Sequence, residues 1–217
     1  ITMALLAYIR IPPPSVAERH EPVRPLAQIA AQPAFIVAVT GSALGYGVMS
    51  LLMTATPLAM GLCGHPYSSA ATVIQWHVIG MFAPSFVTGS LIKRFGVLRI
   101  MLAGVALEAL CVGIALSGAQ VVNFWWARLI LGVGWNFLYV GGTTLLTECY
   151  RVSEKAKAQG THDFLVFLTT ASSSFSSGLL MNRNGWDMLN YAALPVLAVI
   201  AAAIAWLALR RRAGVAA

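Results

Sequence analysis

Long apolar stretches separated by short polar loops constrain this chain more than any other feature. A helix needs about 20 apolar residues to cross the hydrocarbon core of a bilayer. Six stretches reach that length, at residues 33–60, 67–92, 98–116, 121–146, 163–181 and 189–209. We therefore expect an all-α membrane protein with six transmembrane helices between residues 33 and 209.

The composition agrees with a membrane location and excludes several other classes of protein. Charged residues make up only 10% of the chain and hydrophobic residues 59%, whereas a soluble domain carries about 25% charged residues. This balance argues against a cytosolic enzyme, a disordered protein and a nucleic-acid-binding domain, so we expect the lipid bilayer as a partner and no nucleic acid. The sequence also shows no phosphate loop, nucleophile triad or zinc-type cysteine cluster, and we expect no enzyme.

The basic residues predict the topology. Twelve of the 14 lysines and arginines fall in the linker 10–32, the loops 93–99 and 150–160, and the tail 210–217. Cytoplasmic loops carry the excess of Lys and Arg, so we expect the linker and the C-terminus to be cytoplasmic. Residues 1–9 read as the end of a preceding transmembrane helix, which indicates a piece of a longer chain.

A loop motif identifies a family resemblance. Residues 89–96 read Gly-Ser-Leu-Ile-Lys-Arg-Phe-Gly, which resembles the Gly-x-Leu-x-Asp-Arg-x-Gly signature of major facilitator superfamily transporters. In that family the signature lies between the second and third helices of each six-helix half. Here Lys93 replaces the aspartate, so the acidic partner is missing. The resemblance implies the C-terminal half (residues 33–209) of a twelve-helix transporter in a bacterial inner membrane. The first and fourth helices of the half would line the cavity, and the N-terminal six-helix half is missing here.

Two further motifs suggest a cargo. The first span carries Met49-x-x-x-Met53 and the second His77-x-x-x-Met81, which is similar to the CcoA-type copper importers that supply cytochrome oxidase assembly. The resemblance implies these four residues as ligands and Cu(I) as transported substrate, with no prosthetic cofactor. Thioether and imidazole suit Cu(I). Residues four apart share a helix face, so each motif offers two ligands to one side.

Other readings stay open. The methionines can be core packing, and the same branch of transporters includes riboflavin transporters. Aromatic residues lining the cavity, especially Tyr46, Trp135 and Tyr139, would favour such an organic substrate. A non-transporting copper-binding membrane scaffold is an alternative from a different class.

Three further features suggest either a functional or a structural role. Met60, Cys63 and His65 crowd the outer loop, where they form either a copper capture site or an ordinary turn. Glu108 lies near the middle of the third span, and a carboxylate at that depth suggests a proton site or a hydrogen-bonded structural partner. Arg128 lies near the start of the fourth span, and we expect it to be interfacial or structural.

Overall fold

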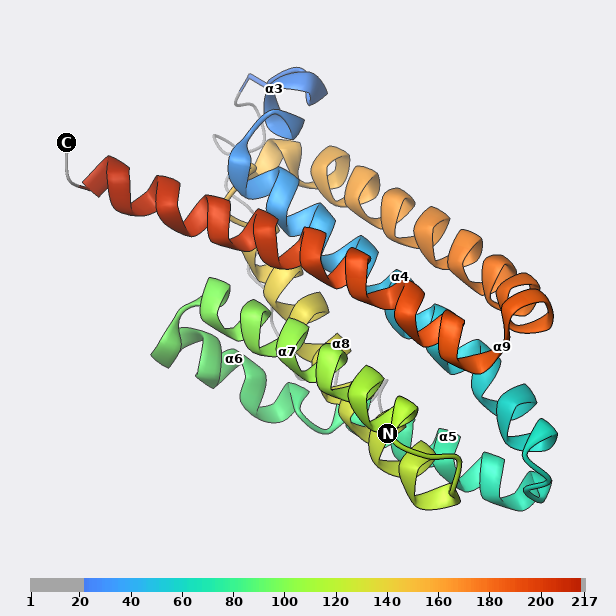
Figure 1. Ribbon diagram of the computed structural model, residues 1–217. Coiled ribbons are helices and arrows are strands. Elements are labelled where there is room, and N and C mark those ends of the chain that lie inside the picture. The colour runs from blue at the N-terminus through green and yellow to red at the C-terminus, as the bar shows by residue number, and fades with distance from the viewer. Residues whose placement is uncertain (1–21, 216–217) are drawn as a thin grey trace, which may run out of the picture.

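The computed structural model describes residues 22–215, which contain helices and no strands (Figure 1). The helices are α3 (Leu26–Ala30), α4 (Pro33–Leu62), α5 (Tyr67–Phe82), α6 (Ser85–Phe95), α7 (Val97–Leu116), α8 (Val121–Leu146), the 3-10 turn η1 (Val152–Glu154) and α9 (Lys155–Val215). The expected helix end at residues 1–9, residues 10–21 of the linker and residues 216–217 of the tail lie outside the described residues.

The expected span at residues 67–92 is broken. Within the described part of the chain, α4, α7, α8 and α9 are each long and apolar enough to cross a membrane. Helices α5 and α6 add a fifth span only when they are taken together, and they bend by 41° at their junction. Pro84 lies at this bend, as the N-cap of α6. A proline interrupts a helix because it lacks an N–H and its ring clashes with the preceding helical turn. The count of six separate spanning helices is therefore not confirmed.

Both remaining expected spans lie inside α9. Gly185 interrupts this helix with φ 77° and ψ −177°, a conformation that glycine adopts without steric cost. Figure 1 shows the two arms, orange and then red, running back in opposite directions. The ranges 163–181 and 189–209 therefore occupy separate arms that meet at a kink.

Glycines let α4 and α5 approach α8 closely. A Cβ atom at Gly45 of α4 would lie 2.8 Å from Leu138 on α8. A Cβ at Gly132 of α8 would lie 2.5 Å from the carbonyl oxygen of His77 on α5. Helix α7 packs on α8 in the same way through Gly104. Small residues permit such backbone approach between membrane helices, and α8 becomes the helix on which the other three converge.

The basic segments gather at one end of the bundle. An ion pair of 2.7 Å joins Arg24 of the linker to Glu154 after α8. Another of 2.6 Å joins Arg211 of the tail to Glu148. The linker, the loop after α8 and the end of α9 are thus neighbours, as the predicted topology requires. The assignment of this end to the cytoplasm stays a prediction.

Candidate substrate site

Four aromatic side chains from three helices meet beside α8. This aromatic cluster consists of Tyr46 on α4, Phe82 at the end of α5, and Trp135 and Tyr139 on α8. The Trp135 and Tyr139 rings stack with centroids 5.1 Å apart and an interplanar angle of 7°. Tyr46 meets Trp135 edge-on at 5.1 Å and Tyr139 at 5.7 Å. Phe82 approaches Trp135 edge-on at 6.2 Å.

The local sequence explains this arrangement. Trp135 and Tyr139 are four residues apart, so they share one face of α8. Tyr46 follows Gly45, the residue at which α4 lies close to α8. Trp135 is 5% exposed, and its Nε1 has no hydrogen-bond acceptor among the described residues. The cluster thus offers stacked and edge-on aromatic surfaces together with an unused N–H donor.

Asn136, which the sequence analysis did not single out, ties the broken span to α8. Its Nδ2 donates to the carbonyl of Met81 and to Ser85 Oγ, both at 2.7 Å. Its Oδ1 accepts from Thr88 Oγ1 at 2.7 Å. One amide therefore holds both sides of the α5–α6 break, where Phe82 joins the aromatic cluster. An amide near the middle of an apolar span was the signal available in the sequence.

The four predicted copper ligands lie on α4 and α5. Met49, His77 and Met81 are buried and Met53 is half-buried. His77 Nδ1 donates to the carbonyl of Arg128 at 2.8 Å, and the Met81 carbonyl accepts from α8, so both residues are positioned against α8. Among residues 22–215 no group of three or more His, Cys, Asp or Glu side chains is placed to hold a metal. The copper site stays a prediction.

The three outer-loop residues have different environments. Met60 lies in the last turns of α4, not in the loop, and its side chain is fully buried. Cys63 is exposed. His65 Nε2 donates to the carbonyl of Ala119 at 2.7 Å, which fastens this loop to the loop between α7 and α8. A copper capture role for these residues is untested.

Glu108 and Arg128 are both fully buried. Neither carboxylate oxygen of Glu108 has a hydrogen-bond partner among the described residues, and the proton role of this residue stays a prediction. Arg128 was expected to be interfacial or structural, and its burial agrees with a structural role, whereas its depth in the membrane stays a prediction. Its Nη2 lies 3.6 Å from Cys111 Sγ, and its guanidinium lies 5.3 Å from the centroid of the Trp186 ring.

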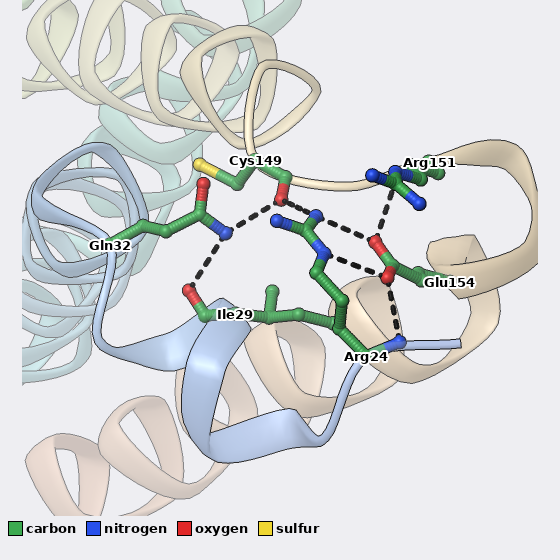
Figure 2. A network of polar contacts seen from close by, with 6 residues as sticks. All are labelled: Arg24, Ile29, Gln32, Cys149, Arg151 and Glu154. Carbon is green, nitrogen blue, oxygen red and sulfur yellow. Dashed lines mark hydrogen bonds and ion pairs between the residues drawn. The ribbon is translucent and has the colours of Figure 1, made fainter. Parts of the chain in front are cut away.

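A polar network at the basic end fixes the linker to the loop after α8 (Figure 2). Arg24 donates to Glu154 through Nε at 2.8 Å, Nη2 at 2.7 Å and its backbone N–H at 2.9 Å. Arg24 Nη2 and Gln32 Nε2 also donate to the carbonyl of Cys149, at 3.0 and 2.8 Å. The hydrogen bonds from Arg24 and from the Arg151 backbone hold the pKa of Glu154 well below its usual range. We call this network the linker clamp.

The long apolar helices indicate a membrane protein, and the match of most of the chain to a family model identifies a membrane transporter. Residues 43–216 match the model of the Major Facilitator Superfamily. The chain belongs to this family, whose members are multi-pass membrane proteins. Members of the family are transporters and in general are not enzymes.

Named relatives give the resemblance more detail. The chain is 44% identical over 181 residues to the riboflavin transporter RfnT of Brucella anthropi, covering 83% of this chain and 46% of the relative. It is 32% identical over 161 residues to the uncharacterized MFS-type transporter YddS of Bacillus subtilis, covering 73% of this chain and 37% of the relative. The chain thus spans less than half the length of these curated relatives.

Proposed function

We propose that the full-length protein transports a small, flat aromatic molecule, with riboflavin as the leading candidate, across a bacterial inner membrane. The observation that carries this proposal is the aromatic cluster, because three of its four rings lie on α4 and α8, the two helices that the family resemblance assigns to the cavity. The riboflavin transporter among the relatives supports the same reading. It favours an organic cargo over copper.

The chemistry of the cluster suits a planar ring system. Aromatic rings attract one another in offset-stacked and edge-to-face arrangements, and the cluster already uses both. The unpartnered Nε1 of Trp135 is a donor that a heterocyclic carbonyl or ring nitrogen can accept from. In this proposal, Phe82, which is 59% exposed, forms the open side through which the substrate meets the cluster.

Riboflavin uptake tests the proposal directly. Bacteria that cannot synthesise riboflavin would express the full-length protein, and uptake of labelled riboflavin would be measured over time. An aromatic contact contributes about 0.5–1.5 kcal/mol beyond area burial, so Trp135→Ala should raise the KM roughly 2- to 12-fold or more. Tyr139→Phe keeps the ring and should leave the KM within about twofold.

A matched control separates the site from general damage. Trp126→Ala alters another tryptophan of α8 that is 48% exposed, and it should leave the KM unchanged. The proposal fails if the expressed protein takes up no riboflavin, or if Trp135→Ala and Trp126→Ala behave alike.

Copper is a second candidate, and one observation favours it. The Nδ1 of His77 is occupied by the Arg128 carbonyl, so the neutral ring keeps the Nε2 lone pair, and this buried atom has no partner among the described residues. Nε2 of a neutral imidazole is a common metal ligand. Labelled copper uptake in the same cells decides between the cargoes. If copper is the cargo, Met49→Leu and His77→Ala should abolish its uptake while the protein still accumulates.

A further inference from the structure

A cavity of about 320 Å³ lies at the basic end of the bundle, between the α6–α7 junction and the last turns of α9. Arg99 of α7 and Arg211 and Arg212 of α9 contribute to its lining. The substrate site described above does not include these residues. The cavity is therefore separate from the aromatic cluster.

The charge of the cavity suits an anion. Arg211 is paired with Glu148 at 2.6 Å. Within residues 22–215, Arg99 and Arg212 make no ion pair with a carboxylate. Arginine presents a planar fork of N–H donors that matches the oxygens of a phosphate group. Two unpaired arginines across one cavity thus provide the chemistry of a phosphate site.

The apolar part of the lining identifies the source of that phosphate. Leu98, Leu102 and Ala208 also line the cavity, and exposed apolar side chains continue from it along both helices. Leu102 is 38% exposed on α7, and Leu209 is 65% exposed on α9. A free phosphate ion gains nothing from such walls, whereas an acyl chain does. The ends of membrane-spanning helices lie at the depth of lipid headgroups, where basic pockets bind anionic headgroups.

We propose that this cavity binds an anionic phospholipid of the surrounding bilayer. Its phosphate lies between Arg99 and Arg212, and one acyl chain follows the groove between α7 and α9 past Leu102. The lipid bridges the loop before α7 and the C-terminal end of α9. This inference is independent of the transported substrate, because none of its residues belongs to the aromatic cluster.

Lipid retention by the purified full-length protein tests the proposal. The protein would be reconstituted in nanodiscs containing phosphatidylglycerol and phosphatidylcholine, extracted with mild detergent, and analysed for bound lipid by native mass spectrometry. Wild type should retain phosphatidylglycerol in preference to phosphatidylcholine. The double variant Arg99→Gln/Arg212→Gln should weaken this retention on the order of thirty-fold. Each basic group near an anionic headgroup raises the affinity for the lipid about fivefold, and the variant removes two of them.

A control variant and a free anion complete the design. Arg210→Gln removes a neighbouring charge that lies over the Trp206 ring, 4.8 Å from its centroid, and does not line the cavity. It should preserve retention, and an unchanged size-exclusion profile would show that all variants are folded. Equal losses in Arg210→Gln and the double variant would overturn the proposal in favour of general surface charge. Displacement of the lipid by millimolar inorganic phosphate alone would overturn the lipid assignment in favour of a simple anion site.

Discussion

Gly132→Ala tests a close backbone contact between α8 and α5. A Cβ atom at this position would lie 2.5 Å from the carbonyl oxygen of His77 and 2.8 Å from the amide nitrogen of Met81. Both are backbone atoms of α5, so no side chain can rotate away. Ordinary contact begins at 3.4 Å, and α5 must therefore move from α8 by about 0.9 Å to accommodate the methyl group.

Three effects set the change in the free energy of unfolding of Gly132→Ala. Overpacking a close contact costs about 1–3 kcal/mol, while replacing glycine by alanine inside a helix returns about 1 kcal/mol. The shift also lengthens the hydrogen bonds from His77 to the Arg128 carbonyl and from Asn136 to the Met81 carbonyl, now 2.8 and 2.7 Å. Each such bond contributes about 0.5–1.5 kcal/mol. We expect a net loss of about 1–4 kcal/mol.

Thermal unfolding of the full-length protein in detergent measures this loss. Gly132→Ala should lower the Tm by several degrees. Gly113→Ala on α7 is the matched control, because a Cβ there meets nothing within 4 Å, and its Tm should not fall. If Gly132→Ala unfolds at or above the wild-type temperature, the backbones of α5 and α8 are farther apart than the 2.5 Å contact of an added Cβ requires. That result would refute the close packing of α5 on α8.

Three further outcomes are expected. Asn136→Leu should reduce riboflavin uptake more than protein accumulation, because it removes all three hydrogen bonds that hold the α5–α6 break to α8. Thr88→Val removes only one of these bonds and should reduce uptake less. Equal uptake by the two variants would contradict the role of the amide. The depressed pKa of Glu154 means that the linker clamp stabilises the protein above the ordinary glutamate pKa and loses this contribution as the pH falls below it. The Tm gap between wild type and Glu154→Gln should therefore be constant from pH 6 to 8 and narrow below about pH 4.3; a gap that widens in acid would refute this sign. Impermeant maleimide on intact cells should label the exposed Cys63 but not Cys149, which is buried and whose thiol pKa is raised to about 11 by that burial. Labelling of Cys149 alone would contradict the predicted topology.

Three of the four residues in the aromatic cluster could be predicted from the sequence, and the fourth could not. The sequence singled out Tyr46, Trp135 and Tyr139 as residues that would favour an organic substrate. The stacking of Trp135 on Tyr139 follows from their spacing of four. The position of Tyr46 depends on how α4 crosses α8, and that of Phe82 depends on where the end of α5 lies against α8. Spacing on one helix is a local property, whereas the choice of neighbouring helix is not.

The sequence by itself determined the all-α membrane class, the superfamily and the grouping of basic segments at one end, because the length of an apolar stretch, a loop motif and the position of a charge are local. Only the tertiary structure decided that His77 and Met81 are positioned against α8, that Arg128 is enclosed, and that Arg24 of the linker closes on Glu154. The periodicity of a helix shows which residues share a face, and in a chain this apolar every face is a plausible interface. The glycines that allow two backbones to approach select the actual partner, and their effect depends on the crossing of whole helices.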